Sequence, residues 1–165
     1  MTALNIGDAA PQFELPDLSE QSVSLSELRD TPVVLFFFRT DCSWCEVEMP
    51  KLAEVYRAHS ESVVHVLNIA VGEEQNVVEI FLRDKDFDFP ILLDHNGQVA
   101  LNYTLERVPT VVMVSAEGNI ERVYEGSAEQ LGGIVEQSIL AAARGVELPT
   151  YSLIGNGCAP LNATN

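Results

Sequence analysis

Residues 33–50 read VVLFFFRTDCSWCEVEMP, and this stretch decides the fold. Its first part, Val33–Phe38, is an unbroken run of β-branched and aromatic residues, which is typical of a strand covered on both faces. The apolar residues that follow with helical spacing are Cys45, Met49, Leu52 and Tyr56. A buried central strand therefore leads into an amphipathic helix that reaches about His59, and a C-x-x-C pair, Cys42 and Cys45, lies at the junction.

The remainder of the chain alternates strands and helices. We expect an N-terminal β-hairpin followed by one helical turn at Leu25–Arg29, because Ser24 and Glu27 have capping-box spacing. The later elements expected are a strand at Val63–Val71, a helix at Asn76–Lys85, a strand at Pro90–Leu93 closed by a turn at Asp94–Gly97, a hairpin of Val111–Val114 and Ile120–Tyr124, and a helix capped by Ser127–Gln130 that runs to about Arg144. This order predicts an α/β fold with a central mixed sheet and helices on both faces. We expect one domain over residues 1–146 and a C-terminal tail, 147–165.

Composition excludes several classes of function. The chain has 165 residues, of which 47% are hydrophobic, so it can bury a core and is not disordered. Its 25 acidic and 9 basic residues give a net charge of −16, which argues against nucleic-acid and anionic-membrane partners. The longest apolar run, Val33–Phe38, is too short to span a bilayer, so we expect no membrane insertion. The first residues lack the basic start and apolar centre of a signal peptide, and we expect a cytoplasmic protein.

The two cysteines of the C-x-x-C have the asymmetry that disulfide exchange requires. Cys42 lies at the start of the predicted helix, where unpaired N–H groups favour a thiolate, so we expect an exposed nucleophile. Cys45 lies on the buried face, which suits a resolving thiol. Asp41 opposes thiolate formation at Cys42 unless Asp41 caps the helix or Arg39 screens its charge.

The alternative for a C-x-x-C is half of a zinc site. Zinc takes four ligands, and the only other candidates are three scattered histidines, His59, His65 and His95, and the distant Cys158. We therefore expect no metal and no bound cofactor. Cys158 is either a third thiol that exchanges with the pair or binds another chain, or a tail cysteine without a role; we adopt the second interpretation.

Several segments together resemble the TlpA/ResA-like thiol-disulfide oxidoreductases, which are thioredoxin-fold proteins of the AhpC/TSA-related superfamily. Besides residues 33–50, these segments are Ile6–Leu15 with Val23–Leu28, Phe89–Asp94 and Val108–Thr110. The resemblance implies a thioredoxin-like fold in which Cys42 and Cys45 form a redox-active disulfide and exchange disulfides with proteins. It also implies a cis peptide bond before Pro109, with Pro109, Val108 and Trp44 binding the substrate.

The same resemblance raises a role for Glu73, because the family carries a glutamate after the central strand. Glu73 is then either a proton carrier for Cys45 or an exposed loop acid like Glu74, and both interpretations stay open. The expected partners are protein thiols or disulfides and an upstream redox partner. We expect a monomer or weak dimer that contributes to cell redox homeostasis. Because such relatives are usually exported, a periplasmic location is the alternative if this chain is a mature fragment.

Two other functions compete with disulfide exchange on this scaffold. A peroxiredoxin-type thiol peroxidase carries a hydroxyl residue three positions before its reactive cysteine, whereas Arg39 occupies that position before Cys42. A redox-silent peptide-binding module would need neither cysteine. Disulfide exchange, with its antioxidant consequences, is therefore the function that we predict.

Overall fold

The structure is a computed structural model that describes residues 4–59, 64–126, 131–148 and 157–158. A five-stranded mixed sheet forms its centre, in the order β5-β4-β3-β6-β7. Its strands are β3 (Val33–Phe38), β4 (His65–Val71), β5 (Ile91–Asp94), β6 (Thr110–Val114) and β7 (Ile120–Glu125). The predicted α/β fold with a central mixed sheet is confirmed.

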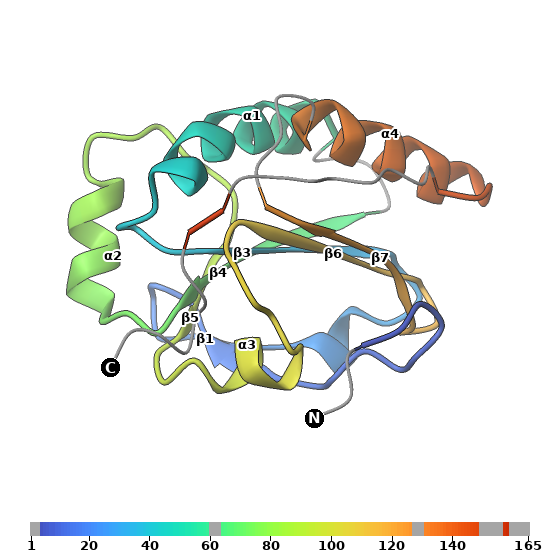
Figure 1. The fold of residues 1–165 in the computed structure, drawn as a ribbon, viewed down its shortest axis with the longest axis horizontal. Coiled ribbons are helices and arrows are strands. Elements are labelled where there is room, and N and C mark those ends of the chain that lie inside the picture. Colours follow the sequence, from blue (N-terminus) through green and yellow to red (C-terminus); the bar gives the residue numbers. More distant parts are fainter. Residues whose placement is uncertain (1–3, 60–63, 127–130, 149–156, 159–165) are drawn as a thin grey trace.

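The helices lie on both sides of this sheet (Figure 1). They are α1 (Ser43–His59), α2 (Gln75–Leu82), α3 (Gln98–Asn102) and α4 (Leu131–Arg144). Helices α1 and α4 pack together over one face, while α3 lies on the other face with the N-terminal hairpin. That hairpin consists of β1 (Glu14–Pro16) and β2 (Ser22–Ser24).

The central position of β3 follows from its composition. All six of its residues are buried, and it pairs with β4 in parallel and with β6 in antiparallel orientation. Apolar side chains on both faces of a strand stabilise it only where both faces are covered. In the register with β6, Phe37 lies opposite Thr110, so the chain just before Thr110 comes level with the loop that follows Phe38. This register brings the C-x-x-C next to Val108 and Pro109.

The expected helical turn after Ser24 forms, but its expected side-chain cap does not, and one helix was not expected. Ser24 makes no capping hydrogen bond through its side chain, and the turn that follows is a 3-10 helix, η1 (Leu25–Leu28). Helix α3 was not expected, and it forms because the Asp94 carboxylate accepts hydrogen bonds from the backbone N–H groups of Val99 and Ala100, at 3.1 and 2.9 Å. The predicted cap at residues 127–130 lies outside the described residues.

The N-terminal segment crosses the molecule and holds to the central sheet at two places. Asp17 forms an antiparallel bridge with Leu92 in β5, and Ala9 forms one with Asn119, next to β7. The hydroxyl of Tyr103 donates a hydrogen bond to the Pro11 carbonyl at 2.8 Å. This segment is therefore part of the domain.

Candidate active site

Cys42 caps the N-terminus of α1. Its carbonyl accepts a hydrogen bond from the Glu46 N–H at 3.1 Å, which is the first bond of the helix. The free N–H groups of the first turn and the helix dipole favour negative charge at this point, so the fold stabilises a Cys42 thiolate whenever the sulfur is reduced.

Cys45 lies on the buried face of α1, as predicted, and is a free thiol with no exposed surface. Burial raises the pKa of Cys45 to about 12, against the effect of a hydrogen bond with the Arg39 backbone, and the negative charges of Glu73 and Asp41 raise it further. At neutral pH this thiol is therefore protonated, and it needs a proton acceptor before it can attack a disulfide.

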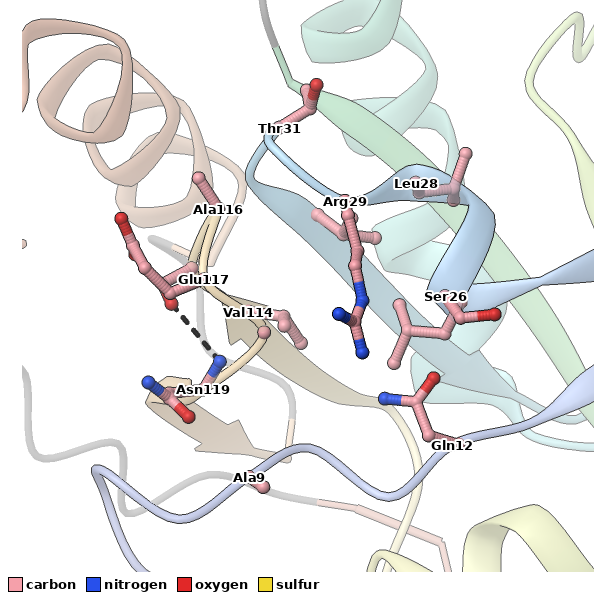
Figure 2. A pocket seen from close by; sticks show the side chains of 14 residues that line it. Ala9, Gln12, Ser26, Leu28, Arg29, Thr31, Val114, Ala116, Glu117 and Asn119 are labelled. Carbon is pink, nitrogen blue, oxygen red and sulfur yellow. Dashed lines mark hydrogen bonds between the residues drawn. The ribbon is translucent and has the colours of Figure 1, made fainter.

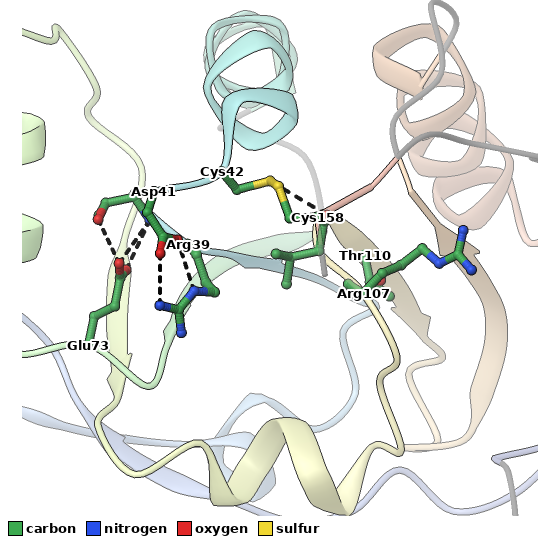
Figure 3. The surroundings of a disulfide bond; sticks show 9 residues. Arg39, Asp41, Cys42, Glu73, Arg107, Thr110 and Cys158 are labelled. Atoms are coloured by element: carbon green, nitrogen blue, oxygen red, sulfur yellow. Dashed lines mark hydrogen bonds and ion pairs between the residues drawn. A yellow bond between two sulfur atoms is a disulfide. The ribbon is translucent and has the colours of Figure 1, made fainter. Parts of the chain in front are cut away.

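The sulfur of Cys42 is bonded to Cys158, not to Cys45 (Figure 3). The two residues are 116 positions apart in the chain, and their Cα atoms are 5.8 Å apart, which is a usual spacing for a disulfide. The interpretation of Cys158 as a tail cysteine without a role is therefore wrong. The expectation of an exposed Cys42 is also wrong for this state, because the bonded residue is only 1% exposed.

Val108 and Pro109 lie beside this disulfide. The Val108–Pro109 peptide bond is cis, as the resemblance implied. The Val108 carbonyl oxygen lies 3.7 Å from the Cys42 sulfur and accepts a hydrogen bond from the Cys158 N–H at 2.8 Å. Trp44 is 38% exposed, so its ring is available to a partner molecule. Substrate binding by Trp44, Val108 and Pro109 stays a prediction.

Arg39 neutralises Asp41, as the sequence required for a reactive Cys42. The guanidinium donates to both carboxylate oxygens of Asp41, at 2.9 and 3.1 Å (Figure 3). It also donates to the Val71 carbonyl, at 3.2 Å. This bidentate pair holds the pKa of Asp41 below its usual value. The negative charge next to Cys42 is therefore matched by an adjacent positive charge.

Glu73 is buried and turned toward the cysteine loop, whereas Glu74 is exposed. Its carboxylate accepts hydrogen bonds from the Thr40 N–H, at 3.0 and 3.2 Å, and from the Thr40 hydroxyl at 2.6 Å. Its charge also acts on Cys45. Glu73 is therefore not a loop acid like Glu74, while its role as a proton carrier stays a prediction.

The sequence did not point to Thr40 as a site residue, and the interpretation adopted for Cys158 was the wrong one of the two. Thr40 gave only a weak signal, a hydroxyl two positions before Cys42. Cys158 gave a stronger one, because a third cysteine next to a glycine, Gly157, can approach a backbone closely. Neither signal is periodic, and each contact spans a long sequence separation, so the contacts become visible only in the folded chain.

A cavity of about 120 Å³ lies away from the cysteines, between the N-terminal segment, η1 and the β6–β7 turn. Figure 2 shows Gln12, Ser26, Arg29 and Asn119 around it. Its volume is below the range of pockets that hold cofactors or drug-sized ligands. Within the described part of the chain, no group of three or more histidine, cysteine, aspartate or glutamate residues could hold a metal ion, and no helix is long and apolar enough to cross a membrane.

The order of strands and helices, with a C-x-x-C at the first turn of α1 opposite a cis proline, defines a thioredoxin-like redox protein. The AhpC/TSA family profile matches residues 6–123, and the chain belongs to this family.

Two curated relatives are thiol-disulfide oxidoreductases named ResA. The chain is 34% identical to the ResA protein of Geobacillus kaustophilus over 126 residues, which cover 76% of this chain and 72% of that protein. It is 33% identical to the ResA protein of Oceanobacillus iheyensis, and the match covers 74% of this chain and 66% of that protein. The chain thus spans about two thirds of the length of the latter relative.

Solved structures agree with this assignment. A structure from Chlorobium tepidum, described as a candidate thiol:disulfide interchange protein DsbE, superposes with a TM-score of 0.80 at 25% identity. The match covers 86% of this chain and 99% of that one. The thioredoxin domain of a Bacteroides vulgatus thiol-disulfide oxidoreductase has a TM-score of 0.72 at 24% identity, covering 83% of this chain and 99% of that one, and supports the fold alone.

Proposed function

We propose that this protein is a thiol-disulfide oxidoreductase that exchanges disulfides with protein substrates through Cys42 and Cys45. The observation that carries the proposal is the position of the two sulfurs on α1. Cys42 caps the helix, where a thiolate is stabilised, and Cys45 lies one turn further on the buried face. Both residues are within the part of the chain that matches the family.

Reduction of a substrate follows from this geometry in two steps. The Cys42 thiolate attacks one sulfur of a substrate disulfide, and the other substrate sulfur leaves as a thiolate that takes up a proton. Cys45 then loses its proton and attacks the Cys42 sulfur, which releases the second substrate thiol and leaves a Cys42–Cys45 disulfide. Two electrons pass from the enzyme to the substrate, and the reverse sequence oxidises a substrate dithiol.

Glu73 is the proposed proton carrier for Cys45. The resolving thiol is protonated at neutral pH, so the second step requires a base. The Glu73 carboxylate is buried beside the cysteine loop, and its charge already acts on Cys45. The hydrogen bonds from Thr40 hold this carboxylate in place. Glu73 would accept the proton in one direction of the reaction and return it in the other.

Substrates are proposed to lie along Val108 and Pro109. The Val108 carbonyl points to the Cys42 sulfur at 3.7 Å, so a peptide that presents its cysteine to Cys42 also meets a backbone acceptor. Trp44 adds an exposed apolar surface at the start of α1. We propose an upstream dithiol or disulfide protein as the partner that restores the starting redox state.

Reduction of insulin disulfides tests this function. Wild-type protein should accelerate the reaction with dithiothreitol as reductant, and Cys42→Ser should reduce the rate to the uncatalysed level. In a Cys158→Ser background, Cys45→Ser should lose turnover but still form a covalent adduct with its substrate. Equal rates for wild type and both variants would disprove the proposal, and consumption of hydrogen peroxide at a higher rate than insulin reduction would favour a thiol peroxidase instead.

A further inference from the structure

We infer that Cys158 is a third redox-active cysteine, an internal substrate of Cys42, and that one disulfide moves between Cys42–Cys158 and Cys42–Cys45. The inference rests on the proposed function, since it uses the same nucleophile and the same resolving thiol. It adds a site that the match to the family does not contain, because residues 6–123 end before Cys158.

The position of Cys158 is that of a substrate cysteine. Its sulfur is bonded to Cys42, and its N–H donates to the Val108 carbonyl, the acceptor proposed for a substrate backbone (Figure 3). Its side chain also packs against the hydrophobic core. The bonded tail therefore reproduces the covalent complex that Cys42 would form with a protein, made from the chain's own residue.

Gly157 allows this close approach. A Cβ atom at position 157 would lie 3.0 Å from Cδ of Arg107 and 3.2 Å from the Val108 carbonyl oxygen. The second of these atoms belongs to the backbone and cannot swing away as a side chain can. A side chain at position 157 would therefore crowd the Val108 carbonyl, and Cys158 could keep its contacts with Val108 and Cys42 only if the backbone shifted by a few tenths of an ångström.

The exchange itself is balanced without any added reagent. Cys45 loses a proton and attacks the Cys42 sulfur, the Cys42–Cys158 bond breaks, and the Cys158 thiolate leaves and takes up a proton. A Cys42–Cys45 bond forms in its place. One disulfide and one thiol are present before and after, so no external oxidant or reductant takes part. The product carries its free thiol on Cys158 in place of Cys45.

Tethering makes Cys158 an effective competitor for Cys42. Leu148, which precedes it, is buried, and its carbonyl accepts a hydrogen bond from Arg122 at 2.8 Å, so the tail starts from a fixed point on the domain. A short tether of this kind gives an effective concentration on the order of millimolar. Protein substrates at micromolar concentration would then displace the tail only by binding Trp44 and neighbouring surfaces as well.

Mapping of the disulfides tests the inference directly. Wild-type protein is equilibrated in a glutathione redox buffer, quenched with acid, alkylated in denaturant, digested and analysed by mass spectrometry. Two forms with one disulfide should appear, one with Cys42–Cys158 and alkylated Cys45, the other with Cys42–Cys45 and alkylated Cys158. After removal of glutathione, either form should relax to the same mixture at a rate independent of protein concentration.

Two glycine variants, both of which keep all three cysteines, test whether the Cys42–Cys158 bond depends on the fit of residue 157 against the domain. Gly157→Ala introduces the contacts described above, whereas a Cβ at Gly133 in α4 meets no atom within 4 Å. Gly157→Ala should lower the ratio of Cys42–Cys158 to Cys42–Cys45 by about fivefold or more, since overpacking of this kind is costly. Gly133→Ala should leave the ratio as in wild type.

The outcomes distinguish this inference from the proposed function. Exclusive formation of Cys42–Cys45 in a protein that still reduces insulin would overturn the role of Cys158 and leave the proposed function intact. A Cys42–Cys158 bond that does not relax after glutathione is removed would show a fixed structural disulfide and would also overturn it. Loss of insulin reduction in wild type, with the exchange still present, would contradict the proposed function alone.

Discussion

The Glu73 carboxylate receives hydrogen bonds from both the backbone N–H and the hydroxyl of Thr40, two residues before Cys42. This contact ties the chain after β4 to the chain after β3, across neighbouring parallel strands. It holds a negative charge at a fixed position in the surroundings of Cys45, whose pKa that charge raises. A buried acid is thereby coupled to the resolving thiol.

Glu73→Gln should slow disulfide exchange, because an amide cannot accept the Cys45 proton, and should shift its pH profile to lower pH. The amide retains the shape of the side chain and an acceptor for Thr40, but it removes a charge that raises the pKa of Cys45. The pH dependence of insulin reduction measures the shift. Glu74→Gln is the matched control, since Glu74 is exposed, and its profile should superimpose on that of wild type. If both variants match wild type, Glu73 has no role in the site.

Asp41→Asn and Arg39→Gln should change the reactivity of Cys42 in opposite directions. Loss of the Asp41 charge removes the carboxylate that neutralises Arg39 near Cys42 and favours the thiolate, while loss of Arg39 leaves Asp41 unscreened. In a background of Cys45→Ser with Cys158→Ser, alkylation of Cys42 by iodoacetamide at neutral pH should become several-fold faster in the first case and slower in the second. The same direction in both variants would contradict this account.

The ion pair itself should add little to stability. The Asp41 side chain is 64% exposed, and exposed pairs contribute roughly 0–1 kcal/mol. Chemical denaturation of Asp41→Asn should therefore give an unfolding free energy within about 1 kcal/mol of wild type. A larger loss would mean that the ion pair stabilises the cysteine loop. The change in the Cys42 alkylation rate would then reflect the lower stability of the variant as well as the change in charge.

Cys45→Ser alone should trap substrates poorly, and Cys45→Ser with Cys158→Ser should trap them well. In the single variant, Cys158 can still bond to Cys42 and expel a bound thiol, because the tail already reaches that sulfur. Non-reducing electrophoresis after incubation with a substrate protein measures the adduct. An equal yield of adduct from the single and double variants would show that the tail does not compete for Cys42.

Cys45 should titrate close to pH 12 in the folded protein, because burial raises its pKa. The variant Cys42→Ser with Cys158→Ser leaves Cys45 as the only cysteine, and thiolate absorbance in the ultraviolet follows its ionisation. In denaturant the same thiol should titrate with a pKa of about 8.5. Since the folded pKa is the higher one, the stability that this thiol contributes is complete below the unfolded pKa and is lost as the pH rises toward 12. Titration at the same pH in both states would contradict the buried position.

The fold was predictable where the chain carries long, regular patterns. The apolar run of β3 and the helical spacing from Cys45 to Tyr56 predicted two packed elements correctly, because burial imposes those patterns on the sequence. Helix α3 has only five residues, too few for a period to show, and its cap at Asp94 is two buried hydrogen bonds. Short elements of this kind are determined by tertiary contacts.

The same distinction applies to the site residues: positions within a regular pattern were predictable, and contacts between distant parts of the chain were not. The positions of Cys42 at the start of α1 and of Cys45 on its buried face followed from their spacing and from the helix that carries them. The bond to Cys158 was not predictable, since 116 residues separate the partners and the tail has no periodicity. The orientation of Glu73 toward Thr40 depends on Gly72, whose φ of 65° turns the chain just before it. A single glycine does not indicate from the sequence alone whether the Glu73 carboxylate points into the protein or toward solvent.

The bridge between Asp17 and Leu92 has a consequence for association between molecules. β5 is the last strand at one end of the sheet, and an uncovered strand of that kind offers a row of free N–H and carbonyl groups to any other extended chain. The N-terminal segment places its own backbone against this strand and adds a carboxylate there. The segment thus protects an aggregation-prone edge of a sheet whose strands are rich in valine, isoleucine and leucine.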